Sequence, residues 1–198
     1  MTAAGIVTIV EGDGEETALP ILLHRIARHF LGRYDLAFPP GRVHGRGKLT
    51  MAGGIENIIE RTVISAHGAD RFLVLIDADD DCPAQLGPDL QRRAAEARPD
   101  KRISVVLANR EYEAWFLAAA PSLAGRRGLS LDLAAPAEPE KPRGCKEWLS
   151  ERRTDGKSYR PTVDQAALTA VFDLALARAN APSFDKLCRE VERLLADC

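Results

Sequence analysis

The sequence predicts a three-layer α/β domain, in which helices cover both faces of a parallel sheet of about four strands. Short runs rich in Val, Ile and Leu are apolar on both faces, as buried parallel strands require. Between these runs lie segments whose apolar residues recur at helical spacing. Strands that alternate with helices in this way pair in parallel, and ligands then bind at the carboxyl ends of the strands.

The N-terminal part predicts one complete strand–helix unit and a weaker second strand. The first strand is expected at 5–10, followed by the acidic run EGDGEET and by a helix at 17–31 that Gly32 ends. A short strand at 37–44 contains two prolines, which restrict it to the edge of the sheet. The segment HGRGKLTMAGG that comes next is expected to be a loop.

The rest of the core continues the alternation. Its expected elements are a helix at 55–67, a strand at 71–76, a helix at 84–97, a strand at 103–107 and a helix over 110–120 with an acidic first turn. After Pro121 the pattern changes to a Pro/Ala-rich stretch, a basic stretch and two helices, at 163–179 and 183–196. We therefore expect a core at 1–120 and, packed on the same domain, a helical extension at 121–198.

Composition bounds the class of protein. The 198 residues are 45% hydrophobic, which is enough for a sizeable core. No apolar run approaches the roughly 20 residues that span a bilayer, and the N-terminus lacks a basic stretch, so we expect a cytoplasmic protein without a membrane partner. The four cysteines form no CxxC pair and the four histidines no HxxxH, which argues against zinc. A net charge of −2 means that nucleic acid would need a local basic patch.

The first acidic cluster follows the first strand, in the sequence Glu11-Gly-Asp-Gly-Glu15-Glu16. A glycine-rich turn at this place can also cradle phosphate, but there is neither a GxGxxG motif nor a Walker lysine. Neighbouring carboxylates would repel a phosphate unless a cation intervened. Oxygen ligands are what Mg²⁺ takes, so a Mg²⁺ or Mn²⁺ site is the simpler interpretation.

The second acidic cluster is the DADDD run after the strand at 71–76. If strand geometry continues, Asp77 and Asp79 point to the same side and can reach one ion. A DxD alone also fits sugar-nucleotide transferases and haloacid-dehalogenase phosphatases, although the latter usually place a nucleophilic aspartate on the first strand. The neighbouring Asp80, Asp81 and Asp13 are expected to cap helices or to remain solvated.

The two clusters together resemble the Toprim domain of topoisomerases, primases and OLD-family nucleases. The resemblance rests on the EGxxE spacing of Glu11, Gly12 and Glu15 and on the later DxD. The segments NREYEAWFLA, SYRPTVDQAAL and ARANAPSF extend it to a bacterial family of small Toprim-like proteins. It implies a Toprim/Rossmann-like fold, acid/base work for Glu11, and Mg²⁺ on Asp77 and Asp79. Glu15 stands where some OLD-type enzymes carry aspartate.

Glu111 and Glu113 open the helix expected at 110–120. By the same resemblance they could hold a second ion, as acidic residues after the corresponding strand do in OLD-family nucleases. The alternative is that they stabilise the helix dipole. We favour the dipole for Glu111 and leave Glu113 open between the two.

Two basic segments could contact a nucleic-acid backbone. The segment at 42–48 follows the second strand and should open on the rim that carries the carboxylates, so Arg46 and Lys48 are expected to orient a scissile phosphate. The run at 141–160 is better explained as a solvated helix face. Trp115 and Trp148 are expected to pack in or beside the core.

The sequence thus favours a Mg²⁺- or Mn²⁺-dependent nuclease that acts on DNA or RNA, with Glu11, Arg46 and Lys48 in catalytic roles. Its metal ligands are expected among Glu11, Glu15, Asp77, Asp79 and Glu113. The resemblance also implies a separately encoded ATPase partner in phage defence, and a homodimer is compatible with it. A non-catalytic module that binds metal or nucleotide is the alternative, and a small phosphatase is a third.

Overall fold

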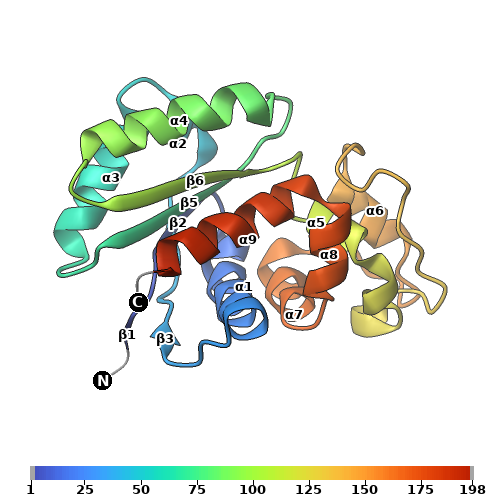
Figure 1. Ribbon diagram of the computed structural model, residues 1–198. Coiled ribbons are helices and arrows are strands. Elements are labelled where there is room, and N and C mark those ends of the chain that lie inside the picture. Colours follow the sequence, from blue (N-terminus) through green and yellow to red (C-terminus); the bar gives the residue numbers. More distant parts are fainter. Residues whose placement is uncertain (1–2, 197–198) are drawn as a thin grey trace.

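The computed structural model describes residues 3–196 and has the predicted three-layer α/β architecture (Figure 1). Four parallel strands form the central sheet in the order β4-β2-β5-β6, and β1 pairs separately with β3. The strands are β1 (Ala3–Ala4), β2 (Val7–Val10), β3 (Leu36–Ala37), β4 (Arg42–Val43), β5 (Arg71–Asp77) and β6 (Arg102–Ala108). The expected strand at 37–44 is thus reduced to β4 at the sheet edge, because the two prolines before it cannot join a ladder.

Helices cover both faces of this sheet. The α-helices are α1 (Asp13–Leu31), α2 (Arg46–Thr50), α3 (Gly54–Ser65), α4 (Pro83–Ala97), α5 (Ala114–Ala118), α6 (Cys145–Glu151), α7 (Ala166–Thr169), α8 (Leu174–Asn180) and α9 (Pro182–Leu195). Two 3₁₀ turns, η1 (Ala120–Leu123) and η2 (Arg126–Gly128), and a π-helical turn, η3 (Pro161–Gln165), complete the set. No helix in the described part of the chain is long and apolar enough to cross a membrane.

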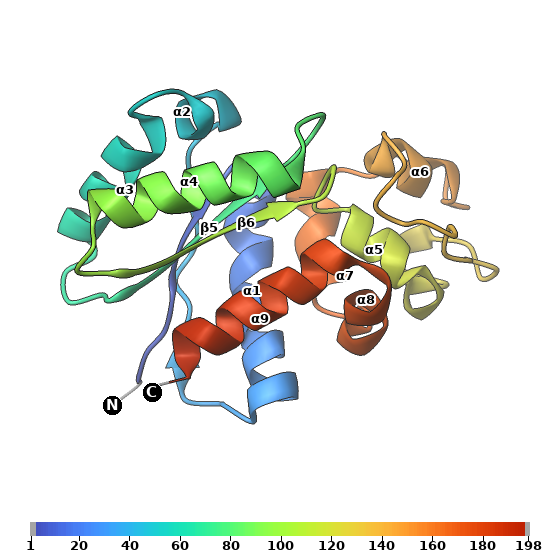
Figure 2. The ribbon, with the colours of Figure 1, turned by 45° about the horizontal axis from the view of Figure 1, so that its top comes forward.

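Alternating side chains of the strands belong to two separate hydrophobic clusters, one on each face of the sheet. Along β5, Phe72, Val74 and Ile76 pack with α3 and α4, whereas Leu73 and Leu75 pack with α1, α9 and the C-terminal helices. Figures 1 and 2 show α3 and α4 on one side of the sheet and α1 and α9 on the other. The apolar runs are therefore apolar on both faces because each face contacts its own helical layer.

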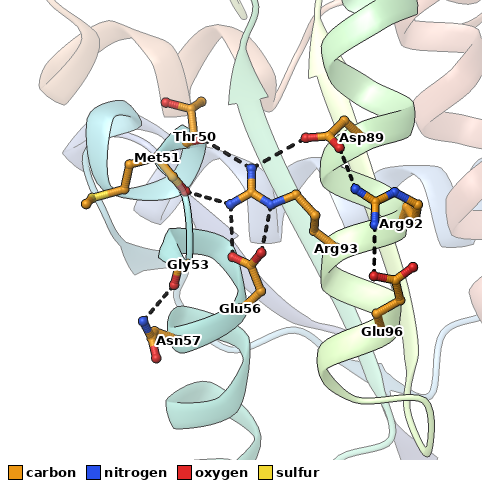
Figure 3. Close-up of polar contacts among 9 residues, drawn as sticks. All are labelled: Thr50, Met51, Gly53, Glu56, Asn57, Asp89, Arg92, Arg93 and Glu96. Atoms are coloured by element: carbon orange, nitrogen blue, oxygen red, sulfur yellow. Dashed lines mark hydrogen bonds and ion pairs between the residues drawn. The ribbon is translucent and has the colours of Figure 1, made fainter.

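The connection that carries α2 is fastened to the α4 layer by one arginine (Figure 3). Arg93 of α4 donates to both carboxylate oxygens of Glu56 in α3, at 2.7 and 2.9 Å. It also donates to the carbonyl oxygens of Thr50 and Met51, at 3.2 and 2.6 Å. The segment expected to be a loop is therefore in part the short helix α2, held in place at its C-terminal end.

The helix expected at 110–120 is much shorter than predicted. Arg110 has a left-handed φ of 65°, and α5 begins only at Ala114, with no acidic residue in its first turn. The backbone N–H of Tyr112 donates instead to the side chain of Asp77, at 2.8 Å. The helix-dipole interpretation of Glu111 is therefore wrong, because that residue precedes the helix.

The C-terminal part also departs from its predicted boundaries. In place of one helix at 163–179 the chain forms η3, α7 and α8, and Asp173 caps α8 by accepting from Leu176 N. The basic run is helical only in α6; it leaves the helix at Arg152 and turns at Gly156, whose φ is 71°. A continuous solvated helix face is therefore the wrong interpretation of 141–160. α9 packs against β6 and α1 and covers one face of the sheet.

Candidate functional site

The carboxyl ends of β2 and β5 bring Glu11 and Asp77 to one cavity of about 350 Å³. These strands are neighbours in the sheet, so residues that follow them meet at the same edge. The cavity is lined by Glu11, Gly12, Asp13, Gly14, Glu15, Gly45, Asp77, Lys146, Pro161 and Thr162. The two acidic clusters are thus brought together, and η3 and α6 of the C-terminal part close the cavity around them.

Asp77 lines this cavity at the end of β5. Its Oδ1 accepts a hydrogen bond from Tyr112 N at 2.8 Å. Desolvation raises the pKa of Asp77 well above its usual range, and the nearby carboxylates of Glu113 and Glu15 raise it further. A group in this position gains from any cation that enters the cavity.

Glu11 is partly buried, and its Oε2 has no hydrogen-bond partner in the described chain. Desolvation raises the pKa of Glu11, the charge of Asp79 adds to this, and Arg46 opposes it. A buried carboxylate oxygen without a partner is costly. It is therefore available for a ligand.

Glu113 lies deeper, fully buried behind the cavity. Its Oε1 accepts from the Tyr159 hydroxyl at 2.8 Å, and its Oε2 lies 3.3 Å from Lys146 Nζ. The same ammonium lies 3.4 Å from Glu111 Oε2. Burial lowers the pKa of Lys146, but the carboxylates of Glu113, Asp77 and Glu111 raise it by more. Lys146 therefore carries a positive charge among these acids.

Both carboxylate oxygens of Glu15, a predicted metal ligand, accept hydrogen bonds from the protein. Its Oε2 accepts from Gly12 N at 3.0 Å and its Oε1 from Gln165 Nε2 at 2.9 Å. These contacts start α1 earlier than predicted and join it to η3. A Cβ on Gly14 would lie 2.1 Å from Gln165 Oε1, so any larger residue here would displace the amide of Gln165.

Asp79 does not continue the strand beyond Asp77. Its backbone is left-handed, with φ 49°, and its carboxylate lies 3.2 Å from Arg46 Nε. Arg46 also donates to the carbonyl oxygens of Asp77 and Ala78 and to the carboxylate of Asp81. The prediction that Asp77 and Asp79 point to the same side is therefore wrong, because strand geometry ends at Asp77. Arg46 binds the chain at this point.

The remaining predicted residues lie away from the cavity lining. Lys48 is exposed on α2. Asp80 lies 2.6 Å from Arg143 and Asp81 contacts Arg46, so these two acids are solvated partners of arginines, as expected. Trp115 is fully buried and Trp148 packs at the edge of the core, also as expected.

Sequence reasoning missed Lys146, Tyr159 and Gln165. Lys146 stood in a basic run interpreted as a solvated face, and the polar side chains of Tyr159 and Gln165 carried no motif of their own. The one available signal was that SYRPTVDQ belongs to the segments that carry the family resemblance.

The donor set can be tested for a divalent ion. Within residues 3–196 no three His, Cys, Asp or Glu side chains converge on a common ion position. Mg²⁺, however, is often held by one or two carboxylates, with water and substrate phosphate completing its shell. The unpartnered oxygen of Glu11 and the desolvated carboxylate of Asp77 fit that pattern.

A family model described as a domain of unknown function (DUF4276) matches residues 10–192. The chain belongs to the DUF4276 family. The match extends from the end of β2 into α9, so it includes every residue of the cavity and both parts of the chain. No curated protein and no solved structure matches this DUF4276 chain.

Proposed function

We propose that the chain is a Mg²⁺- or Mn²⁺-dependent phosphodiester hydrolase of Toprim type that acts on DNA or RNA in the cytoplasm. The observation that supports this most is the pair Glu11 and Asp77, which adjacent parallel strands bring to one cavity beside a cationic lysine. Glu11 and Asp77 would hold the metal. When bound, the ion would polarise water and offset charge on a phosphate.

Glu11 acts as the general base in this proposal. Its raised pKa lies nearer to neutral pH, where a general base is most effective, and the carboxylate oxygen that does not hold the metal would accept the proton. It takes the proton from the attacking water as the new P–O bond forms and the bond to the leaving oxygen breaks. Lys146, which lines the cavity, contacts the phosphate oxygens and offsets their charge.

Lys146 thus takes the place first expected of Arg46 and Lys48. The guanidinium of Arg46 is engaged at the end of β5, where it would keep the backbone of the metal-binding residue in position. The exposed Lys48 would contact substrate only at the rim. A separately encoded ATPase, a role in phage defence and a homodimer are proposals that rest on the Toprim resemblance alone.

A non-catalytic module is the second candidate, and one observation favours it. The ammonium of Lys146 already lies 3.4 Å from Glu111 and 3.3 Å from Glu113, and no three potential ligands converge within the described residues. Such a site could bind a nucleotide or a metal weakly and signal to a partner protein.

Cleavage assays separate the two candidates. Plasmid DNA, single-stranded DNA and tRNA are incubated with Mg²⁺ and with Mn²⁺, using the wild type, Glu11→Gln and the exposed control Glu60→Gln. Loss of the base should lower the cleavage rate roughly 10² to 10⁴-fold with little change in binding, whereas the control should match the wild type. Equal cleavage by Glu11→Gln would remove Glu11 from the mechanism. Cleavage of none of the substrates would favour the non-catalytic module.

A further inference from the structure

A second pocket, of about 510 Å³, lies in the C-terminal part and is strongly basic. Its charged lining consists of four cations and two anions: Arg127, Arg153, Lys157, Arg160, Asp155 and Asp164. The protein as a whole has a net charge of −2, so the sign of the charge in this pocket is opposite to that of the whole chain. Excess cationic charge in a concave surface concentrates anions.

The inner part of the pocket is fixed by a buried ion pair. Arg153 and Asp164 have side chains that are only 7% and 3% exposed, and their charged groups lie 3.3 Å apart. Arg153 also lies 2.6 Å from Asp155. Arg127, whose left-handed φ of 51° is unfavourable for a residue with a side chain, holds its guanidinium 2.8 Å from Asp164. Both aspartates of the pocket therefore form ion pairs with arginines that line it.

The outer cations are free of such partners. Lys157 and Arg160 are exposed, and neither side chain makes an ion pair with any residue in the range 3–196. Their exposure leaves both groups accessible to a ligand. The pocket thus has an inner wall of ion pairs and two exposed cations at its rim, of which Lys157 acts on Asp155 only at a distance beyond an ion pair.

A single stretch of chain separates this pocket from the carboxylate cavity. Pro161 and Thr162 line the cavity, whereas Arg160 before them and Val163 after them line the basic pocket. η3 is therefore a partition with one site on each side. A polymer with regularly spaced phosphates could occupy both sites at once.

We infer that the basic pocket binds a backbone phosphate of single-stranded nucleic acid and so positions the strand beside the carboxylate cavity. Lys157 and Arg160 contact the phosphate oxygens, and Arg127, which is 43% exposed, faces the same anion. Sites that bind single strands use a positively charged groove to follow the phosphate backbone, and this pocket supplies that electrostatic part of such a site. The inference rests on the proposed function for its polymeric ligand, because an isolated anion would not require the adjacent cavity.

Fluorescence anisotropy with a labelled oligo(dT) strand tests this directly, in EDTA so that binding is measured without cleavage. Lys157→Ala/Arg160→Ala is compared with Arg92→Ala/Arg189→Ala, which removes two cations that are 58% and 63% exposed on α4 and α9. Loss of two phosphate contacts should lower the slope of log K against log salt by about 1.4. The same loss corresponds to a roughly 25-fold weaker affinity at about 0.1 M salt. All the substituted side chains are exposed, so the melting temperature should change little.

Three results would overturn the inference. One is equal weakening in the pocket variant and the control variant, and another is the absence of oligonucleotide binding by the wild type. The third is displacement of the strand by inorganic phosphate at the same concentration of phosphate groups, which would indicate a free-anion site. Weakened binding in the pocket variant, together with no cleavage by the wild type, would support the pocket while removing the hydrolase.

Discussion

Tyr159→Phe removes one hydroxyl group and leaves the aromatic ring that fills the same space. That hydroxyl donates to Glu113 Oε1 at 2.8 Å, and Glu113 is fully buried. A hydrogen bond to a charged group contributes roughly 1.5 to 3 kcal/mol. With an unfolding entropy of about 2.1 cal/mol/K per residue, a chain of 198 residues should lose about 4 to 7 °C in melting temperature.

The loss should depend on pH in a defined direction. Burial raises the pKa of Glu113, while Lys146 and the Tyr159 hydroxyl lower it. Removing the hydroxyl raises the pKa of Glu113 in the folded protein further. Tyr159→Phe therefore loses most stability in the pH range where Glu113 of the wild type is ionised. Below the ordinary value of 4.5, Glu113 is protonated in both proteins and the loss should shrink to that of a neutral hydrogen bond, roughly 0.5 to 1.5 kcal/mol.

Thermal unfolding across a pH series measures both effects. Tyr34→Phe is the matched control, because Tyr34 is 73% exposed and its ring contact with Arg28 survives the substitution. A Tyr159→Phe melting temperature equal to that of the control at neutral pH would refute the buried hydrogen bond. A loss that is equally large in acid would refute an ionised Glu113.

Two further predictions concern the cavity. Asp77→Asn keeps the acceptor for Tyr112 N and should stabilise the metal-free protein at about pH 8 but not at about pH 4, by about 1.4 kcal/mol for each unit of raised pKa removed. Its stabilisation by Mg²⁺ should also shrink, and a gain equal to that of the wild type would contradict a metal on Asp77. Gly14→Ala should lower the free energy of unfolding by roughly 0.5 to 1.5 kcal/mol, because its Cβ would lie 2.1 Å from Gln165 Oε1 and would displace the amide that donates to Glu15. Gly47→Ala, with no neighbouring atom within 4 Å, is the control, and equal melting temperatures would contradict the close packing at Gly14.

The central strands could be predicted from sequence because local composition alone determines them. Runs such as RFLVLI are short and apolar on both faces, and this length and composition favour a strand that is covered on both sides. Because ligand-binding residues follow the carboxyl ends of parallel strands, Glu11 and Asp77 could also be predicted to lie at one edge of the sheet. These inferences depend on residues close together in the chain and on a general rule of topology.

The failures share a different cause, which is contact between distant segments. Tyr112 N donates to the side chain of Asp77 and does not take part in the predicted helix. Arg46 donates to carbonyl oxygens at the end of β5, although it was expected to contact a substrate. The sequence around Lys146 is typical of a surface residue, but the fold places its ammonium beside Glu113. None of these pairings leaves a local periodicity, so pattern analysis could not find them.

The position of α9 over β6 has a consequence for how the chain acquires its structure. The inner side chains of the sheet, including Val106 and Leu73, share their cluster with α9 residues such as Leu187 and Val191. Synthesis at about 5 to 20 residues per second leaves roughly 4 to 17 s between completion of β6 and completion of α9. During that interval α1 can cover only part of this face, and the part that α9 later covers stays exposed to water and to other chains. The chain is therefore expected to be most prone to aggregation before α9 packs against β6, and the packing of α9 ends this period.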